Sequence, residues 1–174
     1  MTGRRPPVRS RRRGTLATVE GSGDARGLRF GIAVSRFNEA MTDRLLDAAV
    51  DTLYAAGVER RDLMIVRVPG AFELPLAATL LVGQGRFDGI VCLGAIIRGE
   101  TPHFDYIAQA AALGIMDAGL AGECPVIFGV LTTDTVEQAE ARTAADGLNR
   151  GAEAAATAIE MATLVRRLRA EGCS

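Results

Sequence analysis

Four nearly continuous apolar runs recur along the chain, and segments with helical periodicity separate them. The runs are Phe30–Ser35, Leu63–Val68, Gly89–Ile97 and Pro125–Leu131. A run that is apolar at successive positions is typical of a parallel strand covered on both faces. The alternation of strands and helices predicts a doubly wound α/β/α sandwich of the flavodoxin-like type, with right-handed crossovers. Its sheet is expected to be mainly parallel and four-stranded.

The helix predicted after the first strand has a recognisable beginning, inner face and end. Asn38 belongs to the residue types that cap helix N-termini, and Gly57 suits a helix stop. The apolar positions between them are Met41, Leu45, Ala49 and Leu53. A second helix is expected from Phe72 to Leu81.

Three further helices follow in the prediction. The third is expected to be capped by Thr101, with Pro102 at its first position. Asp134 and Glu137 suggest a capping box for the fourth. The fifth is expected from about Asn149 to Arg169. The expected apolar faces are Phe104, Ile107 and Ala111 in the third helix, and Met161, Leu164, Val165 and Leu168 in the fifth.

The N-terminal part divides into a basic tail and a short strand. Residues 1–14 contain arginines but no acid, and prolines interrupt them. This composition predicts a solvated, disordered tail, and binding of an anionic partner or RNA is the alternative. Residues 15–174 are expected to form a single domain. It begins with a fifth strand at Thr15 to Glu20, which could pair with a neighbouring subunit.

Composition narrows the possible chemistry. The 174 residues, 48% hydrophobic, suit one globular domain, and no apolar run reaches the ~18 residues that span a bilayer. All 20 basic residues are arginine, which excludes a lysine Schiff base. The only histidine is His103, and the three cysteines lack metal-like spacing, so no metal site is expected. The cysteines indicate a reducing, cytoplasmic setting, and the net charge of −1 disfavours nucleic-acid binding.

The first two strand ends carry candidate binding groups, because ligands of such sheets bind beyond the carboxyl ends of the strands. Phe37 could stack on a flat ring, although core packing is the alternative. Gly70 lets the backbone turn, so that the amides of Ala71 and Phe72 point away from a helix N-terminus. Glu73 suits the positive end of the helix dipole, and simple capping explains it equally well.

The third strand end is the most informative segment. Gly99 allows close backbone approach, and the amides up to Thr101 open a helix, which forms an anion site beside Arg98. His103 lies in the first helical turn, where the dipole favours a neutral imidazole that can act as a base. A purely structural histidine is the alternative. The glycines of residues 21–27 do not match the dinucleotide-binding pattern, so no NAD site is expected.

The strand ends together resemble the lumazine synthase family, and the likeness covers roughly Thr15 to Leu168. The matching segments are Ser35-Arg36-Phe37-Asn38, Val68-Pro69-Gly70-Ala71-Phe72-Glu73-Leu74-Pro75, Gly94 to Asp105, Phe128 to Thr135, Glu137-Gln138-Ala139 with Arg142, and Asn149-Arg150-Gly151. The resemblance implies condensation of 5-amino-6-(D-ribitylamino)uracil with 3,4-dihydroxy-2-butanone 4-phosphate. An imine forms between the two substrates, phosphate leaves, and ring closure releases water. No cofactor and no metal take part.

The resemblance also implies a role for each matching residue. Phe37 stacks on the uracil ring, and His103 moves protons. Other substrate-binding positions are Ala71, Phe72 and Glu73 for the ribityl chain and ring edge, Ile96 and Ile97 for the pyrimidine, and Gly99, Glu100 and Thr101 for the phosphate. Phe128, Arg142 and Arg150 are expected to come from an adjacent subunit, with Arg142 on the phosphate. Arg150 stands where many relatives have lysine, and the Glu100 side chain must point away from the phosphate.

The family further implies a homopentamer and, in some members, a shell of 60 subunits. The short connector Ala144 to Leu148 favours the shell, and riboflavin synthase is a possible partner. Two alternatives remain at this point: an archaeal-type riboflavin synthase, and a non-catalytic cage protein that binds lumazine or flavin.

Overall fold

The computed structural model describes residues 17–145 and 149–171, and a single sheet lies at its centre. Its strands are β1 (Phe30–Ser35), β2 (Leu63–Val68), β3 (Gly89–Ile97) and β4 (Val126–Thr133). They are all parallel and run in the order β2-β1-β3-β4. The first three match the predicted ranges, and the fourth extends to Thr133 because it pairs with β3 up to Ile97.

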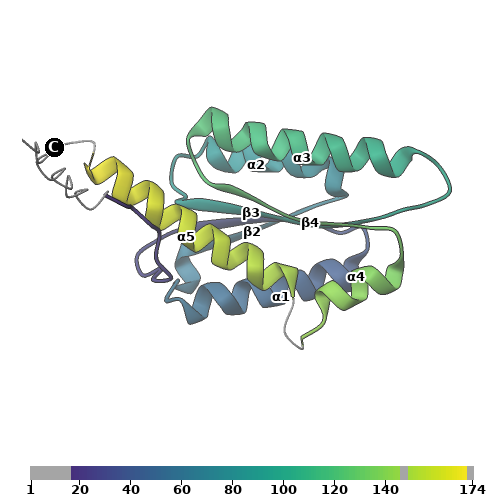
Figure 1. Ribbon diagram of the computed structural model, residues 1–174, viewed down its shortest axis with the longest axis horizontal. Helices are drawn as coiled ribbons and strands as arrows, with labels where there is room; N and C mark the ends of the chain where they lie inside the picture. Colours follow the sequence, from purple (N-terminus) through teal and green to yellow (C-terminus); the bar gives the residue numbers. More distant parts are fainter. Residues whose placement is uncertain (1–16, 146–148, 172–174) are drawn as a thin grey trace, which may run out of the picture.

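Helices cover both faces of the sheet and complete the predicted α/β/α sandwich (Figure 1). One face carries α1 (Glu39–Ala55), α4 (Val136–Thr143) and α5 (Arg150–Glu171). The other carries α2 (Leu74–Val82) and α3 (His103–Gly122). Two short 3-10 helices, η1 (Arg60–Asp62) and η2 (Ala71–Glu73), precede β2 and α2. The second predicted helix therefore begins as a 3-10 turn before it becomes α-helical at Leu74.

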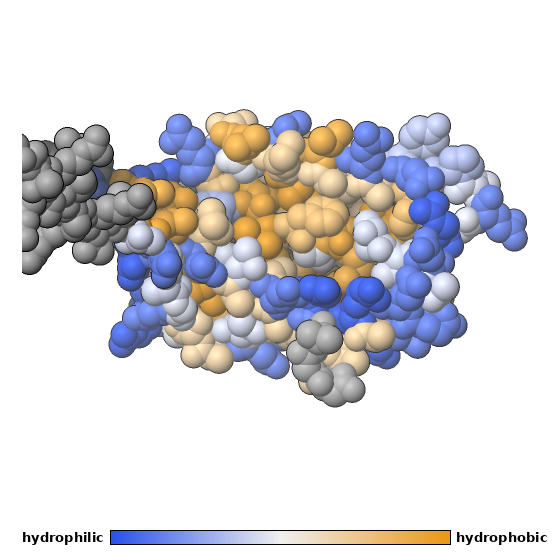
Figure 2. Space-filling model, viewed as in Figure 1, coloured by the Kyte–Doolittle hydropathy of each residue, from blue (hydrophilic) through white to orange (hydrophobic). Residues whose placement is uncertain are grey.

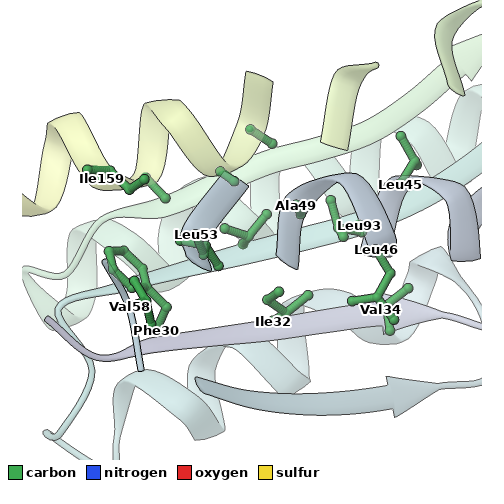
Figure 3. Close-up of a cluster of buried hydrophobic side chains, with 14 of the residues drawn as sticks. Phe30, Ile32, Val34, Leu45, Leu46, Ala49, Leu53, Val58, Leu93 and Ile159 are labelled. Atoms are coloured by element: carbon green, nitrogen blue, oxygen red, sulfur yellow. The ribbon is translucent and has the colours of Figure 1, made fainter. Parts of the chain in front are cut away.

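Each face of the sheet has its own core. Ile32 and Val34 of β1 pack with Leu93 of β3 against α1 and α5 (Figure 3). Alternate residues point to the other layer, where Ala33 and Cys92 pack against α2 and α3. Burial on both faces explains why the strands are apolar at successive positions. It also raises the pKa of the Cys92 thiol to about 12.

Two glycines serve specific purposes on the α1 side. Gly57 adopts a left-handed conformation with φ of 99° and ends α1 as predicted. Gly151 lets α5 approach α1 closely, since a Cβ atom there would lie 2.0 Å from the carbonyl oxygen of Leu45.

Two predicted helix caps lie at other residues in the structure, and Asn38 occupies the predicted cap position of α1 without a capping hydrogen bond. Asn38 precedes α1 in a left-handed conformation with φ of 61°, and its side chain forms no cap hydrogen bond. It donates instead to the carbonyl oxygen of Ala95 at 2.8 Å. Pro102, not Thr101, directly precedes α3, and no side chain caps that helix.

The fourth helix begins one residue later than predicted. Thr135 is its cap, and its hydroxyl accepts a hydrogen bond from the amide of Gln138 at 3.2 Å. The Gln138 side-chain oxygen accepts a hydrogen bond from the backbone amide of Asp134 at 3.0 Å. Thr135 and Gln138 therefore supply the capping bonds in place of the predicted Asp134–Glu137 pair.

The predicted N-terminal strand is absent from the part of it that the structure describes. Residues 17–20 belong to no strand, because no strand of the same chain lies beside them. At their C-terminal end they contact the last turns of α5, where Arg167 donates to the carbonyl oxygen of Glu20 at 2.7 Å. Thr15, Leu16 and the basic tail lie outside the described residues.

The apolar face predicted for the last helix differs from the face that the helix buries, although Met161, Val165 and Leu168 do line one surface. Its buried face consists of small residues and one isoleucine: Gly151, Ala154, Ala155, Ala158, Ile159, Ala162 and Thr163. Met161 and Leu168 are exposed. The sequence pattern indicated an apolar stripe without indicating which surface it meets.

Candidate active site

The carboxyl ends of β1, β2 and β3 surround a cavity of about 660 Å³, here called the ring cavity. Its lining residues are Phe37, Gly70, Ala71, Phe72, Glu73, Ala95, Ile96, Ile97, Gly99, Thr101, His103, Phe104 and Ile107. Parallel strands end at one edge of the sheet, so loops that are distant in sequence meet there. Most of the predicted site residues thus lie around one cavity.

Two phenylalanines give the ring cavity an aromatic character. Phe37 is 71% exposed and Phe72 is 57% exposed. Leaving such large apolar surfaces in water is unfavourable, and the core alternative for Phe37 is wrong. Two hydrogen bonds hold its loop: the Phe37 backbone amide donates to the carbonyl oxygen of Pro69, and the Asn38 side chain donates to that of Ala95. The arrangement can accept a flat ring between loops of different strands.

The polar part of the ring cavity lies between β3 and α3. Gly99, Thr101 and His103 line it, and a Cβ atom on Gly99 would meet no atom within 4 Å. Glu100 is exposed and does not line the cavity, which agrees with a side chain that points away. The backbone amides of Gly99 to Thr101 lie just before a helix of 20 residues, whose positive dipole end suits an anion.

Arg98 sits beside this loop and is bound on three sides. Its guanidinium donates to Asp134 at 2.7 Å and to Asp105 at 3.2 Å. It also stacks over the ring of Phe104, with Cζ 4.2 Å from the centroid. The hydrogen bond that Arg98 donates to the Asp134 carboxylate is the main influence that raises the pKa of Arg98.

The remaining predicted residues line a second cavity of about 370 Å³, here called the arginine cavity. Phe128 comes from β4, Arg142 from α4 and Arg150 from α5. Arg142 donates to the carbonyl oxygen of Gln138 at 2.9 Å. The two cavities share no lining residue. The chain does not bring these three side chains to His103.

Sequence reasoning missed several lining residues. Glu153 lines the arginine cavity and forms an ion pair with Arg150, three residues earlier on α5. Their helical spacing could have revealed that pair. Ala95 near the end of β3 also lines the ring cavity, as do Phe104 and Ile107, which were predicted only as the apolar face of the third helix.

Two general properties of the described residues bear on the chemistry. Residues 17–145 and 149–171 contain no group of three or more His, Cys, Asp and Glu side chains placed to hold a metal ion. Within the same ranges, every helix is too short or too polar to cross a membrane.

Comparisons with known proteins agree on one family. Residues 27–166 match the family model of 6,7-dimethyl-8-ribityllumazine synthase. A protein of that name from Syntrophus aciditrophicus (strain SB) is 52% identical over 150 residues, which cover 86% of this chain and 97% of the relative. Another, from Nitratidesulfovibrio vulgaris (strain DP4), is 47% identical over 153 residues, which cover 88% and 98%.

Proposed function

The chain belongs to the 6,7-dimethyl-8-ribityllumazine synthase family, and from this premise we propose which residues carry its reaction. The protein is an enzyme, a transferase of riboflavin biosynthesis with lumazine synthase activity. It condenses 5-amino-6-(D-ribitylamino)uracil with 3,4-dihydroxy-2-butanone 4-phosphate. The matches are to lumazine synthases, so neither alternative function is retained.

The ring cavity binds the pyrimidine in this proposal. Phe37 stacks on the uracil ring, and backbone groups of Ile96 and Ile97 contact its edge. Ala71, Phe72 and Glu73 hold the ribityl chain. The exposure of Phe37 and Phe72 supports this assignment, because offset stacking on a flat ligand removes their apolar surfaces from water.

The loop from Gly99 to Thr101 receives the phosphate of the second substrate. Its backbone amides supply hydrogen-bond donors at the beginning of α3, and Glu100 contributes only its backbone. His103 lies two residues beyond Thr101 and lines the same cavity. It therefore accepts and returns protons while the imine forms and phosphate leaves.

Each active site joins the ring cavity of one subunit to the arginine cavity of its neighbour. The main observation in support is that the predicted residues divide between two cavities with no common lining residue. Arg142 then reaches the phosphate across the subunit interface, and Arg150 and Phe128 close the site. A ring whose subunits contact one another head to tail completes every site in this way.

Exposed apolar surface supports such an assembly. A surface between α3 and α5, crossing β4, is lined by large apolar residues (Figure 2). Exposed among them are Met116, Leu120, Phe128, Met161 and Leu168. Phe128 borders both this surface and the arginine cavity. The proposed assembly is a homopentamer, which can build a 60-subunit shell and associate with riboflavin synthase.

Inhibition by inorganic phosphate tests the proposed phosphate site. We expect phosphate to compete with the ketose phosphate and not with the pyrimidine, because the Gly99–Thr101 amides and Arg142 form an anion site. The inhibition constant should rise at least tenfold in Arg142→Ala, the typical loss of a charge-assisted bond. Arg86→Ala is the control, since Arg86 lines a different cavity near the beginning of β2. Equal inhibition of the wild type and Arg142→Ala would exclude Arg142 from the site.

A further inference from the structure

Arg98 joins three elements at the edge of the ring cavity. It follows β3, while its partner Asp134 follows β4 and its second partner Asp105 lies in the first turn of α3. The Nε–Oδ1 distance to Asp134 is 2.7 Å, and the Nη1–Oδ1 distance to Asp105 is 3.2 Å. The loop Gly99–Pro102 lies between Arg98 and Asp105 in the chain, so the ion pair between these two residues ties its ends together.

The contacts of Arg98 differ from those of a phosphate ligand. Two carboxylates already offset its charge, and its flat face stacks on Phe104. Phe104 lines the ring cavity, whereas Arg98 does not. The guanidinium thus adjoins the cavity through Phe104, over whose ring it stacks.

Asp134 also contacts the helix that carries Arg142, through its backbone amide and not through its carboxylate. The Asp134 amide donates to Gln138 Oε1 at 3.0 Å, and the carbonyl oxygen of Gln138 accepts from Arg142 Nη1 at 2.9 Å. Asp134 therefore contacts Arg98 through its side chain and the beginning of α4 through its backbone, and α4 carries Arg142.

We propose that Arg98 is a positioning residue for the ketose phosphate, because its bridge between Asp134 and Asp105 holds the Gly99–Thr101 amides in their anion-binding arrangement. This inference rests on the proposed function of that loop. Arg98 acts through the loop and through Asp134, and it does not itself contact the phosphate.

The effect of Asp134→Asn separates positioning from direct binding. If Arg98 positions the loop, losing the Asp134 charge loosens the bridge and weakens binding of the ketose phosphate. If Arg98 were a ligand, the same change would free its charge for the phosphate and strengthen binding. The two roles therefore predict opposite changes in the affinity of the Asp134→Asn enzyme for the ketose phosphate.

The experiment compares Arg98→Gln, Asp134→Asn and the double variant in the assembled enzyme, with KM measured separately for each substrate. We expect each single change to raise the KM for the ketose phosphate roughly tenfold, since small misplacements of binding groups are costly. The pyrimidine KM should stay within about twofold. The double variant should have a ketose phosphate KM no higher than that of the more affected single variant, because both single changes remove the same Arg98–Asp134 interaction.

Two further variants make the comparison specific. Arg98→Lys keeps a charge for Asp134 but cannot hold both carboxylates and stack on Phe104, so we expect an intermediate KM. Arg86→Gln is the matched control, because Arg86 also stacks on a phenylalanine, 4.8 Å from the Phe87 centroid, and lies away from the ring cavity. It should leave both KM values unchanged. Native mass and the thermal midpoint establish that each variant assembles.

A lower or unchanged ketose phosphate KM in Asp134→Asn overturns the proposal, as does an equal rise for both substrates in Arg98→Gln. Thr101→Val distinguishes this failure from failure of the phosphate loop. If Thr101→Val raises the ketose phosphate KM and the Arg98 and Asp134 variants do not, the loop assignment stands and the positioning role is wrong. If none of them raises it, the loop assignment itself is wrong.

Discussion

The ring cavity and the arginine cavity are built at different places in one sheet. The chain leaves β1 toward α1 on one face and leaves β3 toward α3 on the other. Since β1 and β3 are neighbours, a crevice opens between the two crossovers, which is where such sheets bind ligands. The arginine cavity lies instead beside β4, an edge strand.

The ring cavity and the arginine cavity also differ in the chemistry of their side chains. The crevice is lined by aromatic and aliphatic side chains with a few backbone amides and one histidine, which suits a flat ring. The edge offers two cations and one phenylalanine that is 41% exposed. One chain therefore carries both kinds of surface at separate places, and in the proposed active site a second copy supplies the arginine cavity.

Mixing two inactive variants gives the largest expected effect. Gly99→Asp places a carboxylate in the phosphate loop, and Arg142→Ala removes the cation of the arginine cavity. Each uniform assembly should lose roughly 10²–10³-fold in activity, as expected when transition-state charge loses a stabilising group. After joint unfolding and reassembly, about one site in four should pair two intact halves by random mixing around a closed ring. Steady-state activity of the mixture measures this.

The complementation has a clear control. Each variant is first unfolded and reassembled alone, and native mass verifies that it forms the same oligomer. If mixed oligomers form and remain as inactive as their parents, Arg142 does not act across the interface.

His103→Ala gives the next largest expected change and concerns only the ring cavity. General acid–base catalysis typically contributes 10²–10⁴-fold, and we expect about 10²-fold or less in kcat because the substrates are intrinsically reactive. The KM values should change little. The measurement is kcat across a pH series, with His103→Gln to keep the polarity of the site. An unchanged kcat in a correctly assembled variant would remove His103 from the mechanism.

Asn38→Ala should have a smaller effect, again confined to the ring cavity. Alanine is disfavoured at φ of 61° by about 1–2 kcal/mol, and it also loses the bond to Ala95. We expect a lower thermal midpoint and a pyrimidine KM several-fold higher, because Phe37 is adjacent. Asn38→Gly relieves the backbone strain without restoring the bond. A pyrimidine KM equal to that of wild type in both variants would contradict the role of this turn.

Arg150→Lys should have the smallest effect and concerns the arginine cavity. Lysine keeps the charge that pairs with Glu153 but loses the planar fork of donors. We expect less than about a threefold change in the ketose phosphate KM, and a larger one in Arg150→Ala. Similar losses in the two variants would show that the guanidinium geometry matters more than the charge.

The strands and their order along the chain follow from the sequence, because burial on both faces makes parallel strands apolar at successive positions. The same pattern places the loops after β1, β2 and β3 at one edge, so the residues of the ring cavity could be predicted together. Helix ends were predicted less well. Asn38 and Thr135 show why, since a capping side chain can bind any nearby backbone group.

Only the tertiary structure decided which distant groups became partners. The Asn38 amide meets Ala95 and Arg98 meets Asp134, 57 and 36 residues apart, because β3 lies between β1 and β4. The separation of Phe128, Arg142 and Arg150 from His103 likewise depends on β4 being an edge strand. Hydrophobic periodicity reports which face of an element is buried, whereas partner choice depends on strand order and side-chain direction, which no local pattern encodes.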